Sequence, residues 1–408
     1  YIYIYRNKKS VAVDLKHEKG KEIIYKLAEV SDVILENFIP GKSTELGIDY
    51  KTLSEINPKL IYCSLSGFGL TGPYASKPGF DVICSAMYGM MHITGPEGPA
   101  AETQPIKPGV AMTDVTLGLM AHGAILAGLF DRMNTINNPT GVGQHIDTSL
   151  MEAQLSSLVN VAGNYLTGGV DQQHRRGTGH PTIVPYQTFK CLDHRHIALG
   201  IGSDKQFVSF CEAFYIDHDS GLELGTVENV LEGDSRFLTN ADRVANRTVL
   251  VDLLQKQFLT RSREDWEKHF ESYEQKKNKM KQITGTSFVM FPYGAVRSVE
   301  ESFNCPQAQA RNMVVQKQHS GGDGETGGAD SLKLVGHPVK YSRTPCDEVR
   351  LNPPKLGEHT DAVLGLGPMH NNNSSDTGSG SGYTNVSVLK VPYTAAELSS
   401  MRRNKIIQ

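Results

Sequence analysis

Asp114 is the residue of this chain whose type and position most directly suggest chemistry. It follows a loop that ends in Pro108-Gly109, and it stands at the start of a small-residue segment that predicts a helix from Met112 to about Arg132. If Thr113 caps this helix, the Asp114 carboxylate lies on the first turn, where unpaired N–H groups and the helix dipole keep it ionised. An ionised carboxylate can be a nucleophile, although aspartate is also common at helix starts for structural reasons alone.

A cluster of cations precedes the first extended segment. Arg6, Lys8 and Lys9 lie just before residues 11–15, and Lys16 follows at the end of that segment. Two interpretations stay open: a solvated basic turn, or a site for a polyphosphate ligand.

Gly67, Gly69 and Gly72 match the spacing of a dinucleotide-binding loop after a predicted strand. Pro73 follows at once, so no helix N-terminus is available to hold a pyrophosphate, and a nicotinamide or flavin site is disfavoured. What remains is a glycine loop at the carboxyl end of a strand, where open parallel sheets bind ligands.

Other polar residues give weaker signals. His194 and His196 could share one strand face, but no cysteine or carboxylate lies nearby at metal-ligand spacing, so we expect a surface strand and no metal. His180 is a lone loop histidine in this pattern. The six cysteines show no paired spacing, which favours thiols in a reducing compartment.

Composition excludes several classes of protein. With 408 residues the chain can form two domains, and a net charge of −3 gives no general attraction to nucleic acid or anionic membranes. Residues 110–130 are apolar and about as long as a bilayer is thick, but they include Asp114 and His122. We therefore expect a buried helix rather than a membrane span.

Strand and helix signals alternate through the first part of the chain. The pattern predicts extended segments at 11–15, 33–37, 60–65 and 144–148. Helical segments at 17–30, 42–56 and 149–166 alternate with them. This order predicts parallel βαβ units and hence an α/β fold with a doubly wound sheet. A more polar region follows, with a strand at 197–202 and helices near 205–213, 243–258 and 263–273.

The predicted domain organisation is as follows: a large domain at 1–171, a small domain at 172–300, a linker at 301–330, a segment returning to the large domain at 331–370, a low-complexity linker at 371–383, and a terminal helical segment at 384–408. Lys276–Lys281 is a basic run without aromatic residues, which we expect to be a solvated insertion.

A series of motifs in order along the chain resembles family III CoA-transferases. They are RNKKSVAVDLK (6–16), ENFIPGK (36–42), SLSGFGLTGPY (64–74), PGFD (78–81), MHITGPEG (91–98), PGVAMTD (108–114), TGVGQHID (140–147), GTGHPTIVPYQTF (177–189), PYGAV (292–296), CPQAQARNMVV (305–315) and LGEHTDAVL (356–364). Within the family, the chain is most similar to members that take CoA from succinyl-CoA to a dicarboxylate such as hydroxymethylglutarate or glutarate.

The resemblance assigns roles to particular residues. It implies that Asp114 is the nucleophile, and that Gly177, Gly179 and His180 form a loop over the acyl group. It places contacts to CoA at Arg6, Val13, Leu15, Lys16, Asn37, Phe38, Gly67 and Phe68. An arginine that many relatives carry after the ENF motif is Glu45 here.

The resemblance also implies an architecture: a Rossmann-like large domain with a parallel sheet, a smaller α+β domain, and two chains interlocked as rings in a homodimer. Members of the family open with a strand–helix–strand unit that this sequence lacks. The sequence starts at Tyr1 rather than Met. By resemblance we expect a mitochondrial location, and otherwise a cytoplasmic one.

The implied chemistry passes CoA between carboxylic acids through an aspartyl-CoA thioester. CoA and acyl-CoA are then substrates, dicarboxylic acids are the other partners, and no permanent cofactor or metal is needed. The helix start at Asp114 and the loop 177–179 are candidate oxyanion donors. Two alternatives stay open: an acyl-CoA racemase of the same superfamily, although Phe80 stands where those enzymes carry a histidine, or an inactive truncated form.

Overall fold

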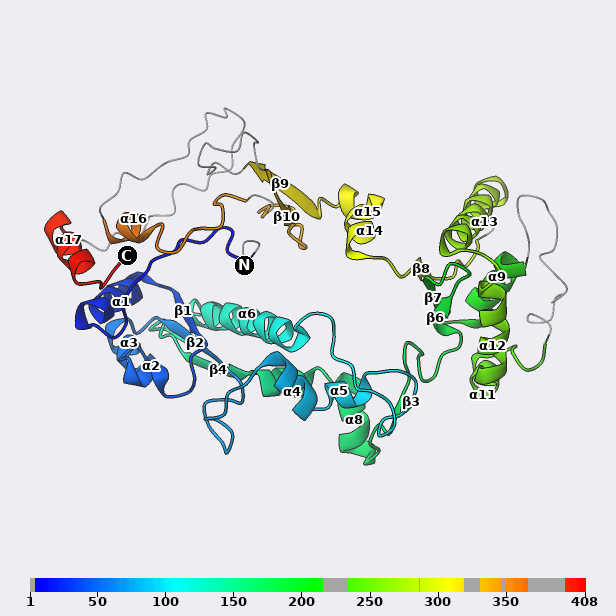
Figure 1. The fold of residues 1–408 in the computed structure, drawn as a ribbon, viewed down its shortest axis with the longest axis horizontal. Coiled ribbons are helices and arrows are strands. Elements are labelled where there is room, and N and C mark those ends of the chain that lie inside the picture. The colour runs from blue at the N-terminus through cyan, green and yellow to red at the C-terminus, as the bar shows by residue number, and fades with distance from the viewer. Residues whose placement is uncertain (1–3, 216–233, 286, 319–330, 347–348, 366–392) are drawn as a thin grey trace. The chain divides into compact units, whose positions relative to one another are not determined.

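The chain forms two compact units, each of which is described by itself. The computed structural model describes residues 4–215, 234–285, 287–318, 331–346, 349–365 and 393–408 (Figure 1). Unit 1 consists of residues 1–90, 107–171 and 306–408, and unit 2 consists of 91–106 and 172–305.

A parallel sheet lies at the centre of unit 1, as the alternating strand and helix signals predict. Its strands β1 (Val33–Glu36), β2 (Ile61–Ser66) and β4 (His145–Ser149) are ordered β1-β2-β4 and are all parallel. The prediction of an α/β fold with a parallel sheet is thereby confirmed. Residues 11–15 are not a strand of this sheet; Val13 instead forms a bridge with Ile407.

Helices cover both faces of this sheet. Helix α6 (Met112–Arg132) has the predicted bounds and lies beside the sheet (Figure 1). Gly128 brings it close to the side chains of Ile61 and Ile146. Tyr62 points to the opposite face because side chains alternate along a strand. There it packs with α1 (Glu18–Val30), α3 (Tyr50–Ile56) and the segment after α2 (Lys42–Glu45).

Two predicted helices of unit 1 are each divided in two. The helix expected at 42–56 is interrupted by Gly47, which has φ 70°, and restarts where the Asp49 side chain caps α3. The helix expected at 149–166 consists of α7 (Leu150–Ser156) and α8 (Val159–Gly168), and Val159 at the break has φ 45°. Both breaks lie within continuous helical patterns of apolar residues, so the pattern alone does not predict them.

Two short helices, α4 (Asp81–Met87) and α5 (Met90–Ile93), follow the glycine loop. With α6 and α7, α4 encloses an apolar cluster formed by Phe68, Cys84, Leu117, Leu150 and Ala153. This cluster fixes the end of the sheet nearest the start of α6.

The chain after residue 305 returns to unit 1, with more regular structure than its composition predicts. The linker expected at 301–330 is wrong for 301–318, which include the end of α14 (Val299–Phe303), α15 (Pro306–Ala310) and β9 (Val314–Gln318). Strand β9 pairs antiparallel with β10 (Ser331–Val335). The predictions for 319–330 and 371–383 lie outside the described residues.

The C-terminal elements are α16 (Thr360–Leu364) and α17 (Ala395–Arg403). A capping box between Thr394 and Glu397 starts α17, which lies within the terminal helical segment expected at 384–408. Ile407 and α17 pack against Ile23 of α1, so the C-terminal residues complete the core beside residues 11–15.

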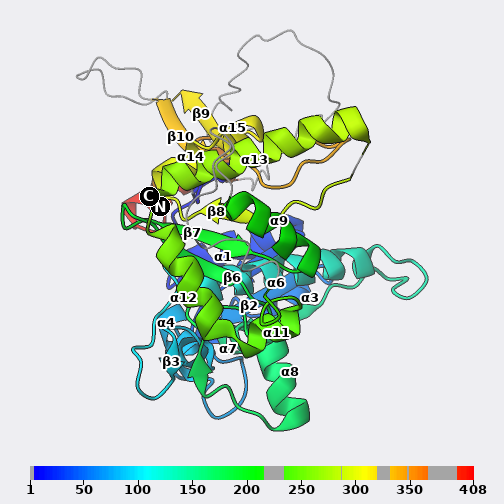
Figure 2. The same cartoon turned by 90° about the vertical axis from the view of Figure 1, so that its right-hand side faces the viewer.

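Unit 2 is built on an antiparallel sheet of β6 (Tyr186–Lys190), β7 (His196–Gly200) and β8 (Tyr293–Ala295). Around it lie α9 (Asp204–Tyr215), α11 (Asn240–Ala245), α12 (Arg247–Phe258) and α13 (Arg263–Thr284) (Figure 2). Its core is aromatic: Phe210, Phe214, Phe258, Trp266 and Phe270 are fully buried and pack ring against ring.

Two predictions for unit 2 are wrong. Helix α13 extends well past residue 273 and carries the basic run Lys276–Lys281 on its last turns, because Lys and Gln are good helix formers. Residues 91–106, predicted to be part of the large domain, belong to unit 2. There β3 (Gly98–Pro99) pairs with β5 (His174–Arg175), and the buried Arg175 donates hydrogen bonds to the carbonyls of Met91, His92 and Thr103.

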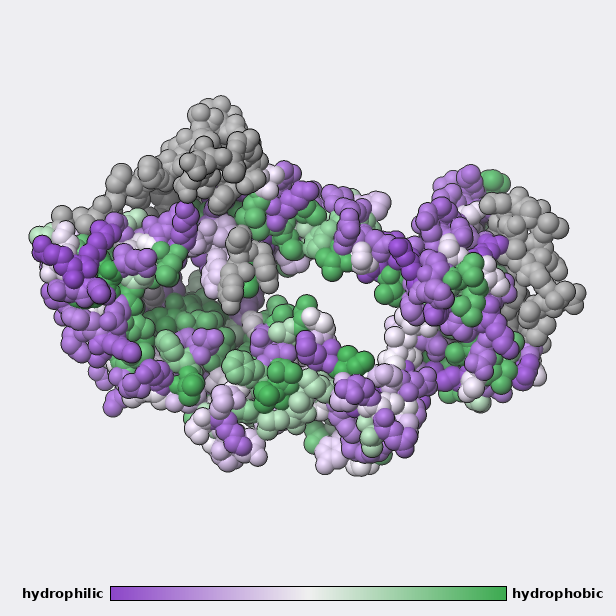
Figure 3. Space-filling model, in the orientation of Figure 1, coloured by the Kyte–Doolittle hydropathy of each residue, from purple (hydrophilic) through white to green (hydrophobic). Residues whose placement is uncertain are grey.

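Helix α6 is only partly buried. It is the one helix among the described residues whose length and composition would allow it to cross a membrane, but Leu117 and Ala121 pack inward on unit 1. The expectation of a buried helix holds for this face alone. Its other face is apolar and exposed over Val115, Leu119, Leu126 and Phe130, and hydrophobic residues are visible in this part of the surface (Figure 3).

Candidate active site

Asp114 lies on the first turn of α6 with its side chain exposed. The helix is held below it by Leu117 and Ala121, which are buried and lie one and two turns further along. The sequence therefore presents the carboxylate on the solvent side of a helix whose inner face is fixed to the sheet.

The cap of α6 is not the residue predicted. Ala111 is at the N-cap position and offers no side-chain oxygen, and Thr113 lies inside the first turn. Asp81, at the start of α4, supplies the missing cap: its Oδ2 accepts hydrogen bonds from the backbone N–H groups of Thr113 at 2.8 Å and Asp114 at 3.4 Å. These are the groups that an N-cap side chain would normally satisfy.

Thr113 fixes the same turn from another side. Its hydroxyl donates to Gln154 Oε1 on α7 at 2.8 Å, and both side chains are buried. The Gln154 Nε2 group and the Ser85 hydroxyl are also buried, and neither has a hydrogen-bond partner within the described part of the chain. The base of the site is thus polar.

The pKa of Asp114 is shifted in the opposite direction from the one that a helix start predicts. Partial removal from water, and next the negative charge of Asp81, raise the pKa of the Asp114 carboxyl. The helix start was expected to favour the ionised form, but its N–H groups are already occupied by Asp81. The ionised form of Asp114 is therefore less stable, relative to the protonated form, than in a free aspartate.

Cys84 lies close to both carboxylates. Burial, followed by the charges of Asp81 and Asp114, raises the pKa of its thiol to about 11. Cys84 is therefore a neutral core residue near pH 7 and is not a competing nucleophile.

Gly67 and Phe68, predicted to contact CoA, have structural roles next to this site. A Cβ on Gly67 would lie 2.6 Å from Cα of Gly79, which shows that two backbone segments touch there. Phe68 is 5% exposed and packs in the cluster below α4. No helix begins between Gly72 and Asp81, as the proline after the glycine loop predicts.

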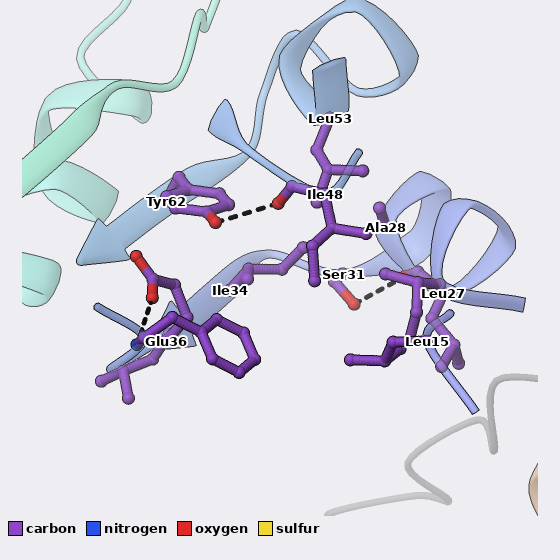
Figure 4. A pocket seen from close by; sticks show the side chains of 12 residues that line it. Leu15, Leu27, Ala28, Ser31, Ile34, Glu36, Ile48, Leu53 and Tyr62 are labelled. Carbon is purple, nitrogen blue, oxygen red and sulfur yellow. Dashed lines mark hydrogen bonds between the residues drawn. The ribbon is translucent and has the colours of Figure 1, made fainter. Parts of the chain in front are cut away.

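A pocket of about 330 Å³ lies at the edge of the sheet in unit 1, between β1, α1 and α3. Leu15, Leu27 and Ile34 face it, and Glu36 lies at its side, where its carboxylate accepts the N–H of Phe38 at 2.7 Å (Figure 4). Tyr62 closes another side, with its hydroxyl bonded to the carbonyl of Ile48 at 2.9 Å. The walls are mostly apolar.

Several predicted CoA contacts come together at this pocket. Leu15 and Phe38 line it, and Lys16 and Asn37 are their exposed neighbours in the chain. The hydrogen bond and charge of Lys42, and then the charge of Lys16, lower the pKa of Glu45, which places two cations on this side of unit 1.

The other two predicted CoA contacts lie away from the pocket lining. Val13 packs in the cluster around the C-terminal helix, and Arg6 donates to the carbonyl of Val335 in β10. Neither residue lines the pocket.

The predicted substrate loop belongs to unit 2, whereas Asp114 belongs to unit 1. Gly177 has φ 56°, a conformation that glycine adopts without strain. The N–H of Gly179 donates to Arg176, the N–H of His180 donates to Tyr186, and Arg247 donates to the carbonyl of His180 at 2.8 Å. The N–H groups of Gly177 and Thr178 have no partner within the part of the chain that the structure describes.

Asp81 and Gln154 are not predicted from the sequence as residues of the site. Asp81 ends the PGFD motif, and its cap joins residues 33 positions apart. Capping rules act between near neighbours, so they cannot indicate a cap supplied by another helix. The lack of a side-chain oxygen at Ala111 is the only local sign that a cap must come from elsewhere.

Comparisons with known proteins agree with the motifs. A family model described as CoA-transferase family III matches residues 1–360. The chain is 37% identical to the human succinyl-CoA:glutarate CoA-transferase over 89% of the chain and 72% of that protein, and 34% identical to a succinate–glutarate CoA-transferase of Agrobacterium fabrum over 88% and 78%. A crystal structure of a CAIB/BAIF family protein from Brucella suis aligns with a TM-score of 0.67 at 32% identity, over 89% of this chain and 82% of that one.

Proposed function

The chain belongs to CoA-transferase family III, and we propose that it transfers CoA between two carboxylic acids with Asp114 as the nucleophile. The observation that carries the proposal is an exposed carboxylate on a fixed helix turn, in a setting that raises its pKa. Such a carboxylate is more basic than a free aspartate and gains more from becoming neutral.

The first half of the reaction loads CoA onto the enzyme. An Asp114 oxygen attacks the thioester carbon of the donor, the C–S bond breaks, and CoA leaves as a thiolate from a mixed anhydride. The thiolate then attacks Cγ of Asp114, forms the aspartyl-CoA thioester and releases the donor acid as a carboxylate. One negative charge enters each step and one leaves, so no proton is consumed.

The second half repeats these steps in reverse order with the acceptor acid. Its carboxylate attacks Cγ of the aspartyl-CoA thioester, and the thiolate then attacks the acceptor side of the new anhydride. Every intermediate is an anhydride or a thioester, so the free energy of the starting thioester is conserved. A serine nucleophile would give a more stable ester and trap the acyl group.

Each addition creates an oxyanion that needs hydrogen-bond donors. The start of α6, one of the two candidates, is largely occupied, because Asp81 takes the N–H groups of Thr113 and Asp114. We assign the role to the glycine loop, whose Gly177 and Thr178 N–H groups are unused within the described residues. In this proposal the glycine loop covers the acyl group and excludes water that would hydrolyse the anhydride.

The CoA moiety is proposed to use the edge of unit 1. Leu15 and Phe38 would contact an apolar part of CoA at the pocket, while Lys16 and Arg6 would contribute positive charge toward its phosphates. Asn37, Gly67 and Phe68 would bound the path between this pocket and Asp114, and Val13 would hold the segment before Leu15 through its packing on the C-terminal cluster.

The proposed substrate class is based on the names of similar proteins. Proteins similar to this chain are named for succinyl-CoA and glutarate, so succinyl-CoA is the proposed donor and a dicarboxylate such as glutarate or hydroxymethylglutarate the proposed acceptor. The proposed assembly is a homodimer of interlocked rings, and the exposed apolar face of α6 supports it, because a surface of this kind usually meets another protein surface. The mitochondrial location remains a prediction.

The direct test is incubation with succinyl-CoA and a panel of carboxylic acids, followed by mass spectrometry of the acyl-CoA products. We expect glutaryl-CoA or hydroxymethylglutaryl-CoA to form with release of succinate, and a peptide containing Asp114 to carry CoA when the acceptor is omitted. Products without any CoA adduct at Asp114 would contradict the covalent route.

A further inference from the structure

We propose that Asp81 is a positioning residue for the nucleophile: it anchors the first turn of α6 through two backbone hydrogen bonds, and its charge favours the covalent, uncharged state of Asp114. This inference rests on the proposed role of Asp114.

The anchoring role follows from the geometry at the start of α6. Ala111 cannot cap the helix, so Asp81 Oδ2 satisfies the Thr113 and Asp114 N–H groups at 2.8 and 3.4 Å. Asp81 lies on the first turn of α4, and α4 packs against α6 through Cys84 and Leu117. The backbone that carries the nucleophile is therefore fixed by a different helix from its own.

The electrostatic role follows from the position of the Asp81 carboxylate next to Asp114. Asp81 is the charged group that raises the pKa of Asp114, after partial removal from water, and the nearby Cys84 is a neutral thiol at pH 7. Thr113 and Gln154 contribute only neutral groups from α6 and α7. Repulsion between the two carboxylates thus acts on Asp114 while it is free.

The repulsion between Asp81 and Asp114 is present before acylation and absent after it. The Asp114 carboxyl is charged before the attack and is uncharged in both the anhydride and the thioester. Acylation consequently relieves the repulsion, and the equilibrium moves toward the covalent enzyme by the same free energy that Asp81 adds to the pKa. The charge of Asp81 stays constant throughout and needs no proton transfer.

Three substitutions separate the two roles. Asp81→Asn keeps an oxygen that can accept the backbone N–H groups but removes the charge, Asp81→Ala removes both, and Asp81→Glu retains the charge. We expect Asp81→Asn to shift the acidic limb of the kcat/KM profile to lower pH. It should also lower the ratio of thioester to free enzyme at a fixed ratio of succinyl-CoA to succinate, by about tenfold for each pH unit of that shift.

The other two variants provide controls. Asp81→Ala should show the same shift and, in addition, a lower melting temperature, because the cap is lost. Asp81→Glu should return the acidic limb toward that of the wild type. If Asp81→Asn lowers stability but leaves the acidic limb and the thioester fraction unchanged, Asp81 is structural and the proposal is overturned.

A measurement without substrate keeps the two proposals apart. The Asp114 carboxyl can be titrated by carbon-13 NMR in the unliganded protein, with its signal assigned by its absence in Asp114→Asn. An unchanged Asp114 titration in Asp81→Asn overturns the present inference whatever the enzyme catalyses. An absent CoA adduct at Asp114 of the wild type, with the titration shifted as expected, overturns the proposed function instead.

Discussion

Gly67 and Gly79 touch backbone to backbone: a Cβ on Gly67 would lie 2.6 Å from Cα of Gly79, and a Cβ on Gly79 would lie 2.4 Å from Cα of Gly67. Gly67 follows β2, and Gly79 comes two residues before Asp81. This contact fixes the chain that carries the Asp81 cap relative to the end of the sheet, and through the cap it fixes Asp114.

Gly67→Ala should therefore impair both stability and transfer. Forcing two backbones apart is comparable to overpacking a core and should cost about 1–3 kcal/mol of unfolding free energy. Because the shift is passed to Asp81, kcat should fall more than KM changes. Gly163→Ala in α8 is the matched control, since a Cβ there meets nothing within 4 Å, and it should raise stability by about 0.5–1 kcal/mol. Equal unfolding midpoints for Gly67→Ala and the wild type in denaturant would show that the contact is not rigid.

Asp114→Asn and Asp114→Ala should each abolish CoA transfer. Neither side chain can form the anhydride, so kcat should fall by at least about 10⁴-fold, as for removal of other covalent nucleophiles. Circular dichroism should show an unchanged fold. Turnover near that of the wild type in Asp114→Asn would rule out this nucleophile.

Asp114→Asn should also make the protein more stable at neutral pH. The pKa of Asp114 is raised in the folded state, so the ionised carboxylate destabilises the fold above that pKa, and this cost disappears as the pH falls toward the ordinary range of an aspartate. The melting temperature of the variant should exceed that of the wild type at pH 7 by a few degrees at most, since the side chain is exposed, and the two curves should meet in acid. A difference independent of pH would point to another cause.

Lys16→Ala should weaken binding of CoA esters more than it slows the reaction. A contact with the phosphates or pantetheine, remote from the reacting carbon, affects ground state and transition state alike, so KM should rise about tenfold with little change in kcat. Lys51→Ala on α3 is a control at another exposed lysine of unit 1. Identical KM values for Lys16→Ala and the wild type would place CoA elsewhere.

The dimer should persist on dilution to nanomolar concentration, because interlocked chains cannot separate without local unfolding. Sedimentation velocity of the wild type should show one species at all concentrations. Phe130→Glu, which puts a charge on the exposed apolar face of α6, should reduce the yield of dimer on refolding. A folded monomer of the wild type would contradict the interlocked arrangement.

The parallel sheet, α6 and the position of Asp114 could be predicted because each depends on local patterns. Alternating strands and helices specify the βαβ order, and the long apolar segment with Asp114 at its start specifies a helix of the observed bounds. The helix breaks at Gly47 and Val159 could not be predicted, because the helical spacing of apolar residues continues across both.

The electrostatics of the site could not be predicted, because they depend on a long-range contact. From the sequence, the start of α6 provides free N–H groups that favour a charged Asp114. In the fold, Asp81 occupies those groups and adds a second negative charge, which reverses the direction of the pKa change. The prediction that residues 91–106 belong to the large domain was wrong for the same reason, since their place in unit 2 depends on the buried Arg175.

The cap from α4 also links the local unfolding of two helices. The amide protons of Thr113 and Asp114 can exchange with deuterium oxide only when Asp81 moves away, so their exchange reports the undocking of α4 rather than fraying of α6. In most helices the first-turn amides exchange fastest. Here they should exchange at the rate of the α4 amides, and the nucleophile should lose its fixed position in the same opening event.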